Sequence, residues 1–433
     1  MKASGTPESA LKNKPGRLFY KRLSYKWYLG IFGFAIALFA LRLWREPSND
    51  QFQVESAYRS GQFQLASNHA DVWVKRHPKW PDAWLWRARL DLALNQPAKA
   101  SEALQKAESL GAKPAEAQVV RSIAGAFAGR FAEVEPLLRN EFNRTGTPDP
   151  LLDEALARIY VGSYDMARGS LVLAKWKKDA PNDPKPFLIS AEVDSRTGNS
   201  AKALTDYREA LARDPLSIKA LFGLAEELRK SQQLAPAADA YDNLLRLQPN
   251  HPQALYGAGC VAADLGEPEK ARQWLKQAIA LSPSHALALH RLAELTIRES
   301  DFKTAIELLD KAQAIDPYDL EISTSRGFVL NQLGRTHELK VELARSKRLR
   351  AELDTLLAAQ ALLVRAPKEL NAQRTIMNWM FAHGKPEEGI RWGESILRDH
   401  PFEPTICEAM ANHYASTGQP GLANSYRSMA RPK

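Results

Sequence analysis

Five prolines spaced 34 residues apart constrain the fold of this chain more than any other feature of its sequence. They are Pro181, Pro215, Pro249, Pro283 and Pro317. Proline makes up about 6% of the chain, so four further prolines in register have a chance probability of roughly 10⁻⁵. The interval is therefore a repeat period, and it predicts a chain built from stacked copies of one small unit.

Each repeat is predicted to consist of a helix, a tight turn and a second helix. Proline suits the boundary because it cannot continue the preceding helix but tolerates the first turn of the next one. With this proline numbered as position 32, small residues recur at positions 8 and 20, bulky apolar residues at position 24 and turn residues near position 15. In that order, the four sets are Ala191, Ala225, Gly259 and Ala293; Ala203, Ala237, Ala271 and Ala305; Tyr207, Tyr241, Leu275 and Leu309; and Gly198, Gln232, Gly266 and Ser300.

This pattern resembles the tetratricopeptide repeat family, whose 34-residue unit also has a large residue at position 4 and a small one at position 27. Here these positions hold Phe187, Leu221, Leu255 and Leu289, and Ala210, Leu244, Ala278 and Ala312. The match is strongest over residues 184–319 and looser on both sides. The resemblance implies an all-α fold, a right-handed superhelical solenoid of about eleven repeats, in which each repeat contacts only its neighbours.

The repeat register breaks after the strongest repeats. From Pro317 to Pro367 there are 50 residues, and from Pro367 to Pro401 there are again 34. The extra residues are predicted to be helical throughout. The expected order is a repeat array over 47–333, an extended helical insertion over 334–366 and further repeats over 367–433. The insertion has a basic run that is either a solvated helix face or a contact for an acidic partner: Arg345, Lys347, Arg348 and Arg350.

Most of the net positive charge lies at the N-terminus. Residues 1–46 hold nine basic and two acidic side chains, which is +7 of the chain's net +9. They surround an apolar stretch, and residues 27–44 are just long enough to form a transmembrane helix. The positive-inside rule then predicts that residues 1–26 are a basic cytoplasmic tail and that the repeats are periplasmic, on a single-pass protein of a bacterial inner membrane. A cleaved signal peptide is the alternative, although no small-residue cleavage site follows the stretch.

The rest of the chain shows no sign of enzyme chemistry or of nucleic-acid binding. Its net charge is only +2, and it has no phosphate loop, zinc-protease motif or nucleophile elbow. Cys260 and Cys407 are expected to be buried and unpaired. His251 and His285 share one turn position, which favours a capping role over metal binding. We therefore expect no catalytic residue, cofactor or metal.

The family resemblance also implies a binding groove. In the family, positions 2, 5, 9 and 12 or 13 of each first helix face the concave side. Position 5 then forms an aromatic column of Phe222, Tyr256 and His290, with a role in binding or in ordinary packing. Position 9 holds glutamates that each have a basic residue four positions later. The expected ion pairs are Glu192 with Arg196, Glu226 with Lys230, and Glu294 with Arg298.

These features predict a non-enzymatic, membrane-anchored scaffold that binds proteins or peptides in its concave groove, in cell-envelope assembly or protein quality control. Two alternatives stay open. One is a regulatory or accessory subunit of a membrane-associated enzyme complex, and the other is a cytoplasm-facing adaptor with inverted topology. We expect no nucleic-acid partner and no small-molecule substrate.

Overall fold

A computed structural model describes residues 49–146 and 148–430, and all regular secondary structure in these ranges is helical. The predicted basic tail (1–26) and membrane span (27–44) lie outside the described residues. Within these ranges no helix has the length and apolar character needed to cross a bilayer. The chain divides into two compact units, Met1–Phe52 and Gln53–Lys433, and the second contains nearly all of the described residues.

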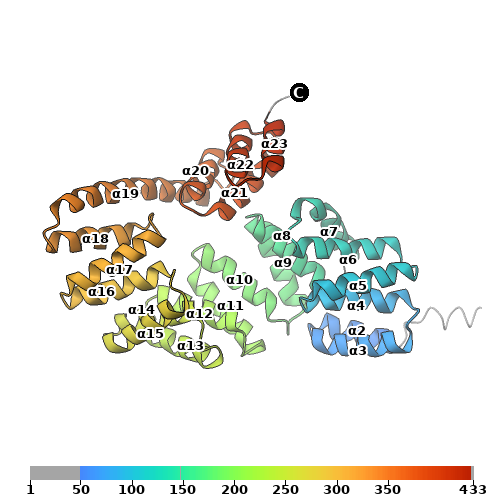
Figure 1. Cartoon of the computed structure of the whole chain (residues 1–433). Coiled ribbons are helices and arrows are strands. Elements are labelled where there is room, and N and C mark those ends of the chain that lie inside the picture. Colours follow the sequence, from blue (N-terminus) through green and yellow to red (C-terminus); the bar gives the residue numbers. More distant parts are fainter. Residues whose placement is uncertain (1–48, 147, 431–433) are drawn as a thin grey trace, which may run out of the picture. The chain divides into compact units, whose positions relative to one another are not determined.

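The helices follow one another as pairs along the chain (Figure 1). The first four pairs are α2 (Asn49–Arg59) with α3 (Phe63–Arg76), α4 (Pro81–Ala93) with α5 (Pro97–Ser109), α6 (Pro114–Phe127) with α7 (Phe131–Thr145), and α8 (Pro150–Gly162) with α9 (Met166–Asp179). The next four are α10 (Lys185–Arg196) with α11 (Ser200–Arg213), α12 (Ile218–Lys230) with α13 (Leu234–Leu247), α14 (Pro252–Asp264) with α15 (Pro268–Leu281), and α16 (Ala286–Arg298) with α17 (Phe302–Ile315). The last three are α18 (Leu320–Gln332) with α19 (Thr336–Arg365), α20 (Leu370–Ala382) with α21 (Pro386–Asp399), and α22 (Pro404–Ser416) with α23 (Pro420–Met429).

The predicted tight turn at position 15 ends each first helix of the central pairs. Its residue has a left-handed backbone conformation, with φ of +80° at Gly198, +58° at Gln232 and +63° at Ser300. In the first of these turns, the N–H of Asn199 donates to the carbonyl oxygen of Asp194 at 2.8 Å. This closure satisfies a free carbonyl at the helix end and reverses the chain, so the two helices of a pair lie against each other.

Two histidines begin first helices, as predicted from their shared turn position. The Nδ1 atom of His251 accepts a hydrogen bond from the N–H of Ala254, and that of His285 accepts one from Ala288, both at 3.2 Å. A side chain that accepts at this point satisfies one of the free N–H groups in the first helical turn. The prediction that these histidines are caps is confirmed.

Consecutive pairs interlock through a tyrosine and a glycine. The ring of Tyr207 on α11 lies against Gly223 on α12, and the ring of Tyr241 on α13 lies against Gly257 on α14. A Cβ atom at either glycine would collide with the tyrosine ring. The absence of a side chain at position 6 therefore lets the position-24 tyrosine of one pair pack closely on the first helix of the next.

The array does not follow nearest-neighbour packing throughout, and this prediction is wrong for its first part. Tyr58 on α2 donates to the carboxylate of Asp149, which precedes α8, and its hydroxyl accepts from the N–H of Leu151 at 3.1 Å. Arg89 on α4 forms an ion pair with the same carboxylate. Two of the first helical pairs are thus joined to the fourth, because the chain curls tightly enough to bring them together.

A second set of contacts joins the start of α10 to the helical pairs that precede it. The Nζ atom of Lys185 at the start of α10 donates to the carbonyl oxygen of Ala93 at 2.9 Å and pairs with Glu154 at 2.8 Å. Buried apolar residues from Val54 to Val193 form one continuous cluster. We call residues 53–193 the N-terminal block, and residues 200–332, where the core divides into separate clusters, the regular array.

The insertion after the regular array forms one long helix. α19 runs without interruption for 30 residues, about twice the length of the other second helices. Beyond it, α21 returns to the N-terminal block. Ser395 donates to the carbonyl oxygen of Ser163 at 3.1 Å, and the ring of Trp392 stacks on Tyr164 with centroids 4.6 Å apart.

Candidate binding surface

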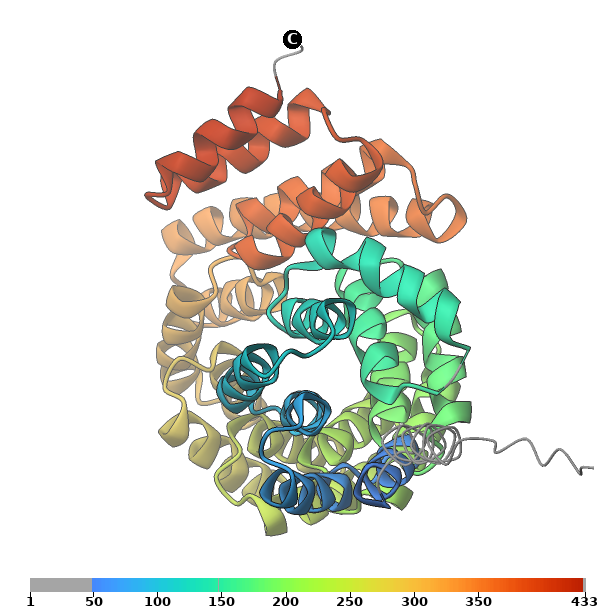
Figure 2. The same ribbon diagram turned by 90° about the vertical axis from the view of Figure 1, so that its right-hand side faces the viewer.

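The packing of the regular array puts its first helices on the inner side of a curve. Each first helix contacts the first helix of the next pair, as α12 does α14, whereas second helices of adjacent pairs make no comparable contact. When successive helical pairs touch through their first helices but not through their second helices, the stack curves with the first helices on its inner side. The pairs follow such a curve in Figure 2. We call the inner side, formed by α10, α12, α14 and α16, the first-helix face.

The predicted aromatic column on this face is shorter than expected. Phe222 and Tyr256 are partly exposed. Each ring packs on the capping histidine of the next pair, Phe222 on His251 at 5.4 Å and Tyr256 on His285 at 4.8 Å between centroids. His290, which was to complete the column, is only 5% exposed, and its Nε2 atom lies 2.9 Å from the hydroxyl of Ser325.

The difference between these rings has a simple cause. The imidazole of His290 has a hydroxyl partner on α18, so the polar ring can be buried without losing its hydrogen bond. Phe222 and Tyr256 instead have a flat ring beside them that holds them in place while one side stays open to solvent. The face therefore offers two fixed aromatic surfaces, one helical pair apart.

The glutamates of the face do not form the predicted i,i+4 ion pairs. Glu226 pairs with Arg229 at 2.9 Å, and Lys230 pairs with Glu227 at 3.7 Å. Glu294 pairs with Arg291 at 2.7 Å. In each case a partner three residues away is better placed.

The predicted ion pair of Glu192 with Arg196 is also absent, and Arg196 instead contacts a residue outside its own helix. The guanidinium group of Arg196 lies over the ring of Tyr164, 5.3 Å from its centroid. Glu192 is exposed to solvent, yet its pKa is raised because the surrounding protein disfavours the charged form more than Lys219, Arg196 and Arg158 favour it.

Two arginines missed by the sequence analysis organise the charges of this face. Arg229 on α12 is held by Glu226, which also accepts from the hydroxyl of Tyr241. Arg291 on α16 is held between Glu294 and Asp264. The recurrence of arginine three residues from a position-9 glutamate was the available signal, but helical spacing allows both i,i+3 and i,i+4 pairs, so the sequence did not distinguish them.

No reactive group emerges near these residues. Cys260 on α14 is a buried free thiol, and Cys407 is buried and free as well, which confirms their predicted burial. Burial is the main cause that raises the pKa of Cys260, so its unreactive thiol form is favoured. Within residues 49–146 and 148–430, no group of histidine, cysteine and carboxylate side chains is arranged to hold a metal ion.

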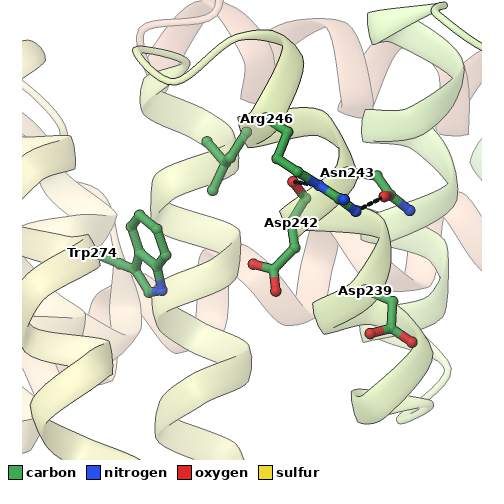
Figure 3. A pocket seen from close by; sticks show the side chains of 6 residues that line it. Asp239, Asp242, Asn243, Arg246 and Trp274 are labelled. Atoms are coloured by element: carbon green, nitrogen blue, oxygen red, sulfur yellow. Dashed lines mark hydrogen bonds between the residues drawn. The ribbon is translucent and has the colours of Figure 1, made fainter.

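A pocket lies away from this face, on the second helices. It has a volume of about 610 Å³, between α13 and α15 (Figure 3). Its lining residues are Asp239, Asp242, Asn243, Leu245, Arg246 and Trp274. Arg246 is turned toward Asn243 and the backbone of its own helix, and the indole of Trp274 forms the opposite side. Its mixed charges select no single chemical class of ligand.

Comparison with known proteins gives one family match and several distant relatives. The tetratricopeptide repeat family model matches residues 222–286, which contain most of α12 and all of α13, α14 and α15. Cellulose synthase operon protein C of Pseudomonas fluorescens (strain SBW25) is 28% identical over 121 residues. That stretch is 28% of this chain and 9% of the relative, so the chain spans only a small part of the relative's length.

Two solved structures are among those to which this chain is similar. MamA is 20% identical with a TM-score of 0.34, covering 39% of this chain and 92% of that one. PilW, a type IV pilus biogenesis factor, is 19% identical with a TM-score of 0.42, covering 45% of this chain and 91% of that one. The family match, together with the 34-residue period and the helical pairs it produces, shows that this chain contains tetratricopeptide repeats.

Proposed function

We propose that this chain is a non-catalytic scaffold that binds a protein or peptide segment on its first-helix face. The observation that carries the proposal is the pair of partly exposed rings, Phe222 and Tyr256, each held by a capping histidine. Rings fixed before binding lose little conformational entropy when a partner stacks on them. The arginines beside them are already paired, so they give the surface a fixed pattern of charge rather than mobile cations.

A site-specific photo-cross-linker tests this assignment. Benzoylphenylalanine replaces Phe222 or Tyr256 in the full chain in its native cells, and a control places it at Asp242 on the outer side. We expect the two inner positions to capture a shared partner that the outer position does not. The variant F222A/Y256A should lose that partner in a pull-down while keeping its helical circular dichroism signal. Equal capture from inner and outer positions would refute the assignment.

We propose further that residues 27–44 anchor the scaffold in a bacterial inner membrane, with residues 1–26 in the cytoplasm and the repeats in the periplasm. The support is the 18-residue span within a segment that carries +7 of the net charge. Protease added to spheroplasts should digest the repeats, whereas protection would favour the inverted topology. The role would then be in envelope assembly or protein quality control.

A second candidate role is that of an accessory subunit of a membrane-associated enzyme complex. The similarity of 121 residues to cellulose synthase operon protein C supports it. Under this proposal, the partner captured from positions 222 and 256 would be an enzyme subunit. A partner with no enzymatic activity would favour the scaffold instead.

A further inference from the structure

The exposed side of α19 has a seven-residue repeat that packing within the chain does not use. Eight residues spaced alternately three and four apart are all exposed, and we call them the α19 seam. They are Lys340, Leu343, Lys347, Arg350, Asp354, Leu357, Ala361 and Val364. This spacing corresponds to the a and d positions of a coiled coil, which form one continuous stripe along a helix.

The opposite side of the helix is fixed to the rest of the chain along its whole length. Glu342 is buried and accepts from Gln313 and Arg326, at 2.8 and 2.7 Å. Further along, Leu356 and Ala359 belong to a buried cluster with Ile376 and Met380 of α20. The helix therefore cannot rotate to bury the seam, which must face outward.

The chemistry of the seam is divided between its two ends. Its first half has three cations, Lys340, Lys347 and Arg350, and none of them takes part in an ion pair within the described ranges. Its second half is mainly apolar, and Leu357 and Val364 are 52% and 84% exposed. Neighbouring Ala358 and Leu362 are exposed as well and widen this apolar part.

We propose that the α19 seam is a docking surface for a partner helix with acidic residues at one end of its apolar face. Acidic side chains would pair with the cations of the first half, and apolar side chains would cover Leu357, Ala361 and Val364. The argument is charge complementarity along a seam with coiled-coil spacing. This site is separate from the first-helix face and does not depend on the function proposed for it.

The separation of cations from apolar residues along the seam argues against two other occupants. In a parallel pair, a second copy of α19 would place cations against cations. In an antiparallel pair, it would leave Lys340 and Lys347 facing the apolar end of the other copy. A membrane surface is disfavoured because the apolar half contains alanine, leucine and valine but no aromatic residue of the kind that anchors helices at that interface.

Two synthetic probes and a charge reversal test the proposal. The acidic probe is a fluorescein-labelled helical peptide of four heptads, with glutamate at the a and d positions of one half and leucine at those of the other. The matched probe has lysine in place of each glutamate. We expect the full chain in detergent to bind the acidic probe at least about tenfold more tightly, by fluorescence anisotropy. The variant K347E/R350E should reverse this preference.

Two further variants separate seam binding from general effects. R208E/K276E changes two exposed charges on α11 and α15, and should bind the acidic probe like the unmodified chain. L357S/V364S replaces exposed apolar residues, so it should fold normally and bind severalfold more weakly. Three results would each overturn the proposal: equal binding of both probes, a chain dimer in sedimentation that K347E/R350E dissociates, or seam amides protected from hydrogen exchange by phosphatidylglycerol vesicles but not by the acidic probe.

Discussion

The N-terminal block and the regular array are built from the same kind of helical pair but are held together differently. In the regular array, each pair contacts the pairs before and after it, and the apolar core divides into separate clusters. In the N-terminal block, Tyr58 and Arg89 reach Asp149 across intervening pairs, and one apolar cluster extends through the whole block. The block has four buried carboxylates, whereas the regular array has one, Glu227. Those of the block are Asp91, Asp153, Glu154 and Asp183.

The difference shows how one repeat can serve two purposes. Contacts between neighbours alone leave the first helices lined up as an open surface, and each pair can respond to a partner without disturbing the next. Contacts between distant pairs join a region into one cooperative unit, but they bury charged groups that depend on one another. The block is therefore the more tightly joined region, and the regular array presents the surface that we propose for binding.

Loss of Arg89 should have the largest effect on stability, because it removes the cation that stabilises the partly buried carboxylate of Asp149. Burial alone would raise the pKa of Asp149, but Arg89 and the Tyr58 hydroxyl hold it below its ordinary value. We expect R89M to lower the free energy of unfolding by about 3 kcal/mol in urea titrations followed by circular dichroism. The matched variant R272M removes an arginine paired with the half-exposed Glu299 of the regular array. It should cost less than about 1 kcal/mol, and equal losses would contradict the comparison.

A steric clash introduced into the regular array should lower the stability by a smaller amount, and only near the substitution. G257A puts a methyl group into the ring of Tyr241 and should cost about 1–3 kcal/mol. By hydrogen exchange, amides of α13 and α14 should exchange faster while those of the N-terminal block keep their rates. G421A on α23 is the control, because a Cβ there meets no atom within 4 Å. Faster exchange throughout the block would show that the two regions unfold together.

The smallest effect expected within a single pH unit is a change in the stability of the N-terminal block. Burial raises the pKa of Asp153 to about 7, although Lys175 lies 3.3 Å away and opposes the shift. Between its ordinary pKa of 3.8 and about 7, the folded chain keeps a proton that the unfolded chain releases, so stability falls as the pH rises. The slope is at most about 1.4 kcal/mol per pH unit.

D153N should reduce this slope between pH 4 and pH 7. Some slope will remain, because burial also raises the pKa of Asp183 to about 6. D239N on α13 is the control, since it removes an exposed carboxylate of the regular array. Urea titrations at several pH values measure both variants. An unchanged slope in D153N would show that its buried carboxyl is already ionised in this range.

The sequence predicted the elements of the fold well because their causes are local. A proline at each boundary, a left-handed residue at the turn and a capping histidine act within a few residues, and so do the small positions of each helix. The candidate surface was predicted less well. Phe222 and Tyr256 are accessible, but the burial of His290 depends on Ser325 in the next pair. The choice of Arg229 and Arg291 as ion-pair partners depends on side-chain packing around them.

By itself, the sequence determined that this protein is a stack of 34-residue helical pairs with a long insertion, since periodicity is a property of the chain. Only the tertiary structure decided how tightly the stack curls. Curvature is the sum of small rotations between pairs, and no single residue sets it. It brings Tyr58 to Asp149 and Ser395 to Ser163 across 91 and 232 positions of sequence.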